Sequence, residues 1–240
     1  MTAYGIIASD LDPSSAIAPQ VYARLRDAII RNRFAPGDRI SESEIARACE
    51  VSRQPVREAF IKLAGEGLLA ILPQRGTIIT KISYTAVLDA RFLREAIEAD
   101  IVAILAQDSD EQLVVDLRRQ LQAQVNVADS KGFIELDERF HRTLADAAGK
   151  RGAWRLIEGL KSQMDRVRFL SLRQFPVAKL IAQHTAIVDR IEAGDGPGAN
   201  TAIRGHLREV LSDLPQIQAA HPDFFDLPDG EIPGPVNAPI

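Results

Sequence analysis

The sequence predicts a mostly α-helical protein in two parts: a small N-terminal unit with three helices and a β-hairpin, and a larger antiparallel all-α bundle of about six helices. Three observations predict this. Apolar residues recur at helical spacing along most of the 240 residues. Strand-like segments occur only between residues 69 and 80. Apolar residues make up 46% of the chain, which is enough to fill a core for one or two domains.

The first predicted elements are a leader and a helix. Residues 1–15 are polar, end in Asp12-Pro13-Ser14-Ser15 and are expected to form a flexible leader. A helix follows from about Gln20, because apolar residues fall at i, i+4, i+7 and i+8: Val21, Leu25, Ala28 and Ile29. Pro36-Gly37-Asp38 then turns the chain.

Two more short helices are predicted before residue 68. Ser41-Glu42-Ser43-Glu44 has the S-x-x-E pattern of a capping box, which satisfies the first free amides of a helix. Ser52 is a good N-cap for the next helix, and Pro55 is tolerated in its first turn. Gly65 or Gly67 ends it.

A β-hairpin completes the N-terminal part. Its strands are predicted at Leu69–Leu72 and Thr77–Thr80, and Pro73-Gln74-Arg75-Gly76 connects them. Helix, helix, tight turn, helix and hairpin is the order of a winged helix-turn-helix, in which the last helix enters the major groove of DNA. We therefore expect residues 16–82 to form a DNA-binding domain.

Residues 83–214 are expected to form an all-helical domain, followed by a proline-rich, extended or disordered tail over 215–240. Glycine, proline and serine residues separate six helical stretches, near 84–107, 110–128, 131–148, 151–174, 176–193 and 196–214.

The charge is unevenly divided between the two parts. The formal net charge is −4, which by itself argues against a polybasic nucleic-acid binder. Residues 16–82, however, hold 11 basic and 7 acidic side chains and carry +4, whereas residues 83–240 hold 18 and 24 and carry −6. Asp10 and Asp12 supply the remaining −2. A small basic domain thus precedes a larger acidic one.

The sequence also bears on the compartment. Cys49 is the single cysteine, so no intramolecular disulfide is possible. The N-terminus lacks the pattern of a signal peptide, and no run approaches the roughly 20 apolar residues of a membrane helix. We expect a cytoplasmic protein without a membrane partner.

The third predicted helix carries residues suited to reading DNA. Arg53, Gln54 and Arg57 lie in its first turns; arginine pairs bidentately with guanine and glutamine with adenine. Ser52 and the first backbone amides of the helix can bind a DNA phosphate. At the hairpin tip, Arg75 offers a positive charge beside Gly76, whose backbone can approach DNA closely. The alternative is a solvated face in which Arg57 pairs with a neighbouring glutamate, Glu50 or Glu58.

The N-terminal part resembles the GntR family of bacterial transcriptional regulators. The resemblance runs without a gap over residues 20–82, and its most specific part is Val-Ser-Arg-Gln-Pro-Val-Arg-Glu-Ala at 51–59. It implies that base and phosphate contacts come from six residues: Ser52, Arg53, Gln54, Arg57, Arg75 and Gly76. Gln54 stands where threonine is common, and Ser43 stands where some members have a DNA-contacting arginine, so the operator is expected to differ.

Three of the four histidines lie in the predicted bundle. Asp137 and His141 are four residues apart on one helix and can chelate one ion. His184 and His206 lie on two other helices, so convergence of all four would suit Zn²⁺, Ni²⁺ or Mn²⁺ with open positions for a ligand. The alternative is that these are ordinary surface or hydrogen-bonded core residues.

Residues 84–214 resemble the all-helical C-terminal domain of the FadR-type branch of this family, the FCD domain. The matching segments are Arg94-Glu95-Ala96-Ile97-Glu98, Asp137-x-x-x-His141, His184-x-x-Ile187 and His206-Leu207. Because six helices are predicted in this domain rather than seven, it resembles the VanR-like group. The resemblance implies a divalent metal, most often zinc, on the aspartate and three histidines, beneath a pocket for a carboxylate effector. Arg94 is the candidate for that carboxylate; its alternative role is an ion pair with Glu98.

These observations predict a homodimeric DNA-binding regulator, more often a repressor, that reads a palindromic operator and responds to a small organic acid. One alternative is a regulator that senses the metal ion itself. Another is a metal-dependent hydrolase, since Asp/His₃ can activate water. The enzyme is disfavoured because the sequence has no H-E-x-x-H, shows no evident general base and would leave the basic domain unexplained.

Overall fold

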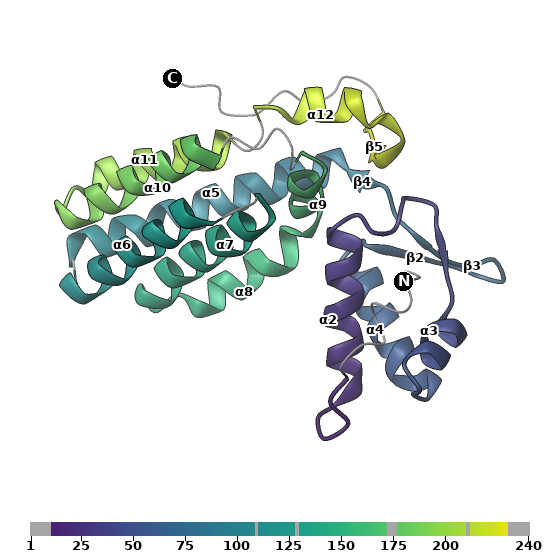
Figure 1. Ribbon diagram of the computed structural model, residues 1–240. Helices are drawn as coiled ribbons and strands as arrows, with labels where there is room; N and C mark the ends of the chain where they lie inside the picture. Colours follow the sequence, from purple (N-terminus) through teal and green to yellow (C-terminus); the bar gives the residue numbers. More distant parts are fainter. Residues whose placement is uncertain (1–10, 109, 128–129, 172–176, 210–211, 230–240) are drawn as a thin grey trace. The chain divides into compact units, whose positions relative to one another are not determined.

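The computed structural model describes residues 11–108, 110–127, 130–171, 177–209 and 212–229. The chain divides into two compact units (Figure 1). The N-terminal unit comprises the chain up to Val87 together with two later segments, Ser162–Leu170 and the described residues from Gln218 onward. The helical unit comprises Leu88–Lys161 and the described part of Ser171–Ile217.

Three helices form the base of the N-terminal unit: α2 (Ile17–Ile30), α3 (Glu42–Ala48) and α4 (Arg53–Gly65). The predicted cap is present, because the Ser41 side chain accepts a hydrogen bond from the Glu44 backbone N–H at 3.4 Å. Apolar side chains of the helices pack with those of the following turn and strands into one core that includes Val21, Leu25, Ile29, Ile45, Phe60, Leu63 and Leu68. This core fixes which face of α4 remains outside.

An antiparallel sheet in the order β1-β3-β2 covers the helices. The predicted hairpin is formed by β2 (Leu69–Leu72) and β3 (Gly76–Ile79), with Leu72 opposite Gly76. β1 (Arg39–Ile40) adds a third strand beside β3. The sequence did not predict β1, because two residues are too few to show strand alternation.

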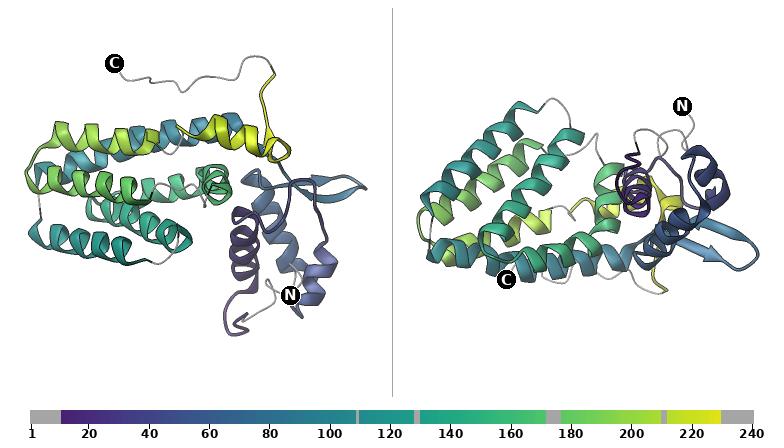
Figure 2. Two further views of the ribbon diagram at one scale, coloured as in Figure 1. Left: turned by 45° about the horizontal axis from the view of Figure 1, so that its top comes forward. Right: turned by 90° about the horizontal axis from the view of Figure 1, so that it is seen from below.

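Six helices lie wholly or mainly in the described part of the helical unit: α5 (Tyr84–Gln107), α6 (Glu111–Asn126), α7 (Ser130–Ala147), α8 (Arg151–Leu160), α10 (Val177–Glu192) and α11 (Gly196–Glu209). α10 packs between α6 and α11, and α7 packs between α6 and α8 (Figure 2). Buried apolar side chains from all six form a single core, which includes Val102, Leu117, Phe140, Ile157, Ile187 and Ile203. None of the described helices is both long and apolar enough to cross a membrane.

The helix predicted over 151–174 is interrupted. α8 ends at Leu160, and a separate helix, α9 (Ser162–Leu170), belongs to the N-terminal unit. Gly159, the residue before the last of α8, weakens the helix near the interruption, and the two helices also differ in their packing. α8 buries one side through Trp154 and Ile157, whereas α9 is buried at every position from Ser162 to Arg168.

The segment expected to be an extended tail contains regular structure. α12 spans Leu214–Ala220, a 3₁₀ turn spans Pro222–Phe224, and β5 (Phe225–Asp226) pairs in parallel with β4 (Ile82–Ser83). Leu214, Ile217 and Phe225 are buried, and this burial outweighs the turn-forming effect of the prolines. Residues 230–240 of the expected tail and 1–10 of the leader lie outside the described residues.

Candidate DNA interface and metal centre

The first turns of α4 present the predicted DNA-reading residues to solvent. α4 begins at Arg53 after Ser52, whose backbone is extended and whose side chain makes no cap hydrogen bond. Arg53 is 69% exposed, and its guanidinium lies 3.5 Å from the Glu42 carboxylate. Gln54 is exposed and donates a hydrogen bond to Glu58 at 3.0 Å.

Arg57 extends this exposed face. Within the part of the chain that the structure describes, it makes no ion pair with Glu50 or Glu58, which was the alternative interpretation. The opposite face of α4 is buried through Val56, Ala59, Phe60 and Leu63, so the arginine-bearing face cannot turn inward. An exposed polar face at the N-terminal end of this helix has the donors needed for base edges and phosphates.

The hairpin turn supplies the remaining predicted residues. Arg75 is exposed in the turn between β2 and β3. Gly76 begins β3 with φ +94°, a left-handed conformation that side chains disfavour. Its missing side chain also leaves the backbone open to close approach by a partner.

Four predicted metal ligands come together inside the helical unit. Asp137 and His141 lie on α7, His184 on α10 and His206 on α11. Each is at most 2% exposed, and their ligand atoms all lie within 4.8 Å of one another. The surface-residue alternative is therefore wrong for all four.

The three imidazoles face one another through their Nε2 atoms. His206 Nε2 lies 3.1 Å from His141 Nε2 and 3.2 Å from His184 Nε2. Asp137 Oδ1 lies 3.4 Å from His184 Nε2 and 3.9 Å from His141 Nε2. Two neutral imidazoles can share one proton, but three converging Nε2 atoms and a carboxylate cannot all be satisfied in this way. A cation among them satisfies every lone pair, so the residues fit a divalent metal.

An outer ring of oxygen atoms surrounds the Nδ1 atoms of the same histidines. His184 Nδ1 lies 2.8 Å from Gln124 Oε1, and His206 Nδ1 lies 3.1 Å from Gln183 Oε1. The third, His141 Nδ1, lies 2.5 Å from Glu98 Oε2, although the two groups are not aligned as a regular hydrogen bond.

These acceptors favour the tautomer with the proton on Nδ1, which turns each Nε2 lone pair toward the centre. Sequence reasoning considered Glu98 only as a partner of Arg94, and it missed Gln124 and Gln183. Nothing in the spacing of the two glutamines distinguishes them from other helical glutamines.

The electrostatics of the cluster suit metal binding. Burial lowers the pKa of His206 well below its usual value, and His184 and His141 lower it further, so the imidazole is neutral near pH 7. Burial alone would raise the pKa of Glu98, but the charge of Arg94 and the contact with His141 outweigh it and lower the pKa to about 2. Glu98 is therefore a carboxylate, able to hold the Nδ1 proton of His141.

Arg94 lies beside this cluster but is engaged. It is buried, and its Nε donates to Glu98 Oε1 at 2.6 Å, so the ion pair considered from the i, i+4 spacing is present. Its positive charge contributes to the lowered pKa of His206. Arg94 is thus close enough to act electrostatically on the cluster.

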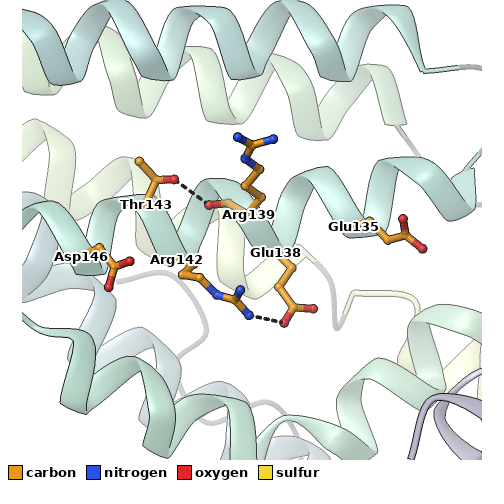
Figure 3. A pocket seen from close by; sticks show the side chains of 6 residues that line it. All are labelled: Glu135, Glu138, Arg139, Arg142, Thr143 and Asp146. Carbon is orange, nitrogen blue, oxygen red and sulfur yellow. Dashed lines mark hydrogen bonds and ion pairs between the residues drawn. The ribbon is translucent and has the colours of Figure 1, made fainter. Parts of the chain in front are cut away.

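The other face of α7 lines a separate open groove of about 460 Å³ (Figure 3). Its lining residues are charged or polar: Glu135, Glu138, Arg139, Arg142, Thr143 and Asp146. Arg142 pairs with Glu138, one turn earlier on α7, and with Glu158 on α8. None of the four metal ligands lines this groove, so it is not the expected effector pocket above the metal.

Known proteins share both parts of this architecture. Residues 17–79 match the family described as bacterial regulatory proteins, gntR family, and residues 89–209 match the FCD domain. The chain is 37% identical over 223 residues to the HTH-type transcriptional repressor RspR of Escherichia coli K12, covering 91% of this chain and 98% of that one. It is also 37% identical to an uncharacterised HTH-type regulator of Streptomyces ambofaciens, covering 89% and 91%.

Solved structures show the same fold. Escherichia coli McbR/YncC superposes with a TM-score of 0.71 at 19% identity, covering 84% of this chain and 98% of that chain. A transcriptional regulator described as GntR from Rhodococcus sp. RHA1 gives 0.69 at 25% identity, covering 86% and 99%.

The winged helix-turn-helix fold with its exposed arginine-bearing helix defines a DNA-binding transcriptional regulator, not an enzyme. More particularly, the chain belongs to the gntR family of bacterial regulatory proteins and carries an FCD domain.

Proposed function

We propose that this regulator is a cytoplasmic repressor that binds a palindromic operator as a homodimer, with one α4 in the major groove of each half-site. The exposed Arg53, Gln54 and Arg57 on the first turns of α4 support this assignment. Arg75 and Gly76 at the hairpin turn would contact the backbone or the minor groove. The repressor role is supported by the name of the relative RspR.

Operator binding tests the role of α4. The operator is first selected from a random double-stranded library with the wild-type protein. Arg53→Ala and Arg57→Ala should each weaken binding by about 5- to 100-fold, because a lost bidentate base contact costs about 1–3 kcal/mol. Arg151→Ala is a matched control, since Arg151 is 75% exposed on α8 and pairs only locally with Asp146. Unchanged affinity in both α4 variants would exclude α4 as the recognition helix.

The second part of the proposal is that Asp137, His141, His184 and His206 bind a divalent metal, with zinc favoured over nickel and manganese. The observation that carries it is the convergence of three buried Nε2 atoms, two pairs of them 3.1 and 3.2 Å apart. Four ligands of this type suit zinc and, with additional open positions, nickel or manganese. When bound, the metal would supply a Lewis-acidic position for an anionic ligand.

Elemental analysis tests the metal site. Wild-type protein should retain about one metal ion per chain after reconstitution, and His184→Ala and His206→Ala should lose most of it. His221→Ala is the control, because His221 precedes the 3₁₀ turn, contacts Phe224 and is not a member of the ligand set. Wild-type protein that holds no metal after reconstitution would refute the site.

The effector is proposed to be a small organic acid whose carboxylate binds between the metal and Arg94. The Arg94 charge lies close to His206, which supports this position. The ion pair of Arg94 with Glu98 favours a second candidate, in which the metal itself is the signal.

Operator binding titrated with zinc, and then with small carboxylates on the zinc-loaded protein, separates the two. A response to zinc alone supports metal sensing, whereas a response that requires an acid and is lost in Arg94→Met supports the effector site.

A further inference from the structure

α9 has an unusual place in the chain. It lies in sequence between α8 and α10, which both belong to the helical unit, yet α9 itself belongs to the N-terminal unit. There it packs against α2 and β4. The chain therefore leaves the helical unit after Lys161 and re-enters it at Ser171. Lys161 alone separates α8 from α9, so a displacement of the end of α8 acts on the start of α9 through the covalent backbone.

α9 contacts the ends of the two principal helices of the N-terminal unit. Gln163 Nε2 donates to the backbone carbonyl of Gly67 at 3.0 Å, two residues beyond the end of α4. Asn32 Nδ2, two residues beyond the end of α2, donates to the carbonyl of Arg166 at 2.9 Å. The Arg31 guanidinium lies 5.1 Å from the centre of the Phe169 ring.

The Gly67 contact leads directly to the recognition helix. Gly67 has φ +68°, so the turn that ends α4 has a defined left-handed geometry. The residue before it, Glu66, receives hydrogen bonds from Arg26 at 2.8 Å and from Tyr22, which tie the end of α4 to α2. A shift of α9 therefore acts on the point at which α4 ends and is anchored.

The docked position of α9 has an unfavourable component. Arg166 is completely buried, its Nε and Nη2 have no hydrogen-bond partner, and its Nη1 reaches only Gln163 at 3.4 Å. No carboxylate pairs with it among the described residues. A desolvated charge with so few partners destabilises the state that buries it. The docking of α9, held by the burial of Met164 and Val167 and by the polar contacts above, is therefore weakened by the buried Arg166.

We propose that α9 is a reversible latch that couples the helical unit to the recognition helix, with the Gln163–Gly67 bond as its contact to α4. The inference rests on the DNA-binding function and not on the metal or the effector. A ligand that favours one position of α8 or α10 would shift the balance between docked and released α9, and with it the placement of α4.

Two variants should move the latch in opposite directions. Gln163→Ala removes the bond to Gly67 and the side-chain oxygen that lies 3.4 Å from Arg166 Nη1, so it should release α9. Arg166→Met keeps the bulk of the side chain but removes the buried charge, so it should favour docking. Gln122→Ala is the matched control, because Gln122 is an exposed glutamine on α6 that bonds only to Asn126.

Hydrogen exchange of the full-length protein measures docking. In Gln163→Ala, amides of residues 162–170 and 63–68 should exchange about threefold to tenfold faster, which is the effect of one lost hydrogen bond. Those of 111–126 should remain unchanged. Arg166→Met should slow the same two segments. Equal changes in 111–126, or no change at 63–68 in either variant, would overturn the proposal.

Operator affinity then tests the coupling. With DNA selected by the wild-type protein, Gln163→Ala and Arg166→Met should shift affinity in opposite directions by about threefold or more, and Gln122→Ala should not. Circular dichroism confirms that each variant is folded. Variants that change exchange but bind the operator like wild type would overturn the latch. Failure of the wild-type protein to select any operator would instead refute the DNA-binding proposal.

Discussion

Replacing Gln124 by leucine should weaken metal binding without disturbing the fold. Gln124 is 1% exposed, and its Oε1 lies 2.8 Å from His184 Nδ1. Leucine has a similar volume but accepts no hydrogen bond, so the Nδ1 proton of His184 loses its partner and the other tautomer becomes accessible. Loss of such an outer partner typically costs 10- to 100-fold in metal affinity, or about 1.4–2.8 kcal/mol.

The structure places the expected effect near the lower end of that range. The His184 ring is also stacked on Phe140, with ring centroids 4.4 Å apart and planes inclined by 24°. This packing preserves the ring orientation when the hydrogen bond is lost, so the variant should lose mainly the preference for one tautomer. We therefore expect about a tenfold weaker zinc affinity.

The assay is a competitive zinc titration of metal-stripped protein against a chromogenic chelator. Gln120→Leu is the matched control: Gln120 lies one turn earlier on α6 and is also buried, but it bonds to Asp116 and Thr143 and to no metal ligand. Thermal unfolding in chelator checks that both metal-free variants are folded. Unchanged zinc affinity in Gln124→Leu, or an equal loss in Gln120→Leu, would refute the role assigned to the outer oxygen ring.

Three further predictions concern stability. Burial alone would raise the pKa of Glu95, but hydrogen bonds from Arg208, Arg204 and Arg91 outweigh it and lower the pKa from 4.5 to about 2. This carboxylate therefore stabilises the fold above about pH 4.5, and about 3 kcal/mol should be lost as the pH falls toward 2. Urea unfolding at stepped pH should show a flatter pH dependence of the free energy of unfolding for Glu95→Gln. Gly67→Ala should lower the free energy of unfolding by about 1 kcal/mol, because Gly67 has φ +68°, which a residue with a side chain disfavours. Gly65→Ala is the control and should not lower it, because Gly65 lies in open space at the end of α4. An equal loss of stability in both variants would exclude the conformational explanation. A chelator should lower the melting temperature of the wild-type protein but leave His206→Ala unchanged, and a shift of the same size in both would show that the chelator acts elsewhere.

The predictable features of the fold have short-range causes. The S-x-x-E cap at Ser41, the hairpin turn before Gly76 and the apolar stripe of α4 all depend on neighbours within about one or two helical turns. Asp137 and His141 could be proposed as metal ligands because residues at i, i+4 share one face of a helix, whatever the rest of the fold does; His184 and His206 joined them through the resemblance to the FCD domain.

The features that were not predictable depend on contacts between distant segments. Residues 162–168 of α9 are buried in the N-terminal unit, and this burial depends on segments far away in the sequence. β5 forms because Phe225 pairs with Ile82 of β4, more than 140 residues earlier in the chain. Gln124 and Gln183 acquire their roles from the positions of His184 and His206 on other helices. No local pattern encodes these pairings.

The parallel pair of β4 and β5 has a consequence for synthesis. Neither the α9 cover of α2 nor the β5 partner of β4 exists until the ribosome has passed residues 170 and 226. A nascent chain, or a fragment ending at residue 82, has the three N-terminal helices and the hairpin but lacks both late segments. The core of these helices and strands lies within residues 21–79, so the DNA-reading unit can form early in synthesis, and α9 and β5 join it only after the helical unit has been made.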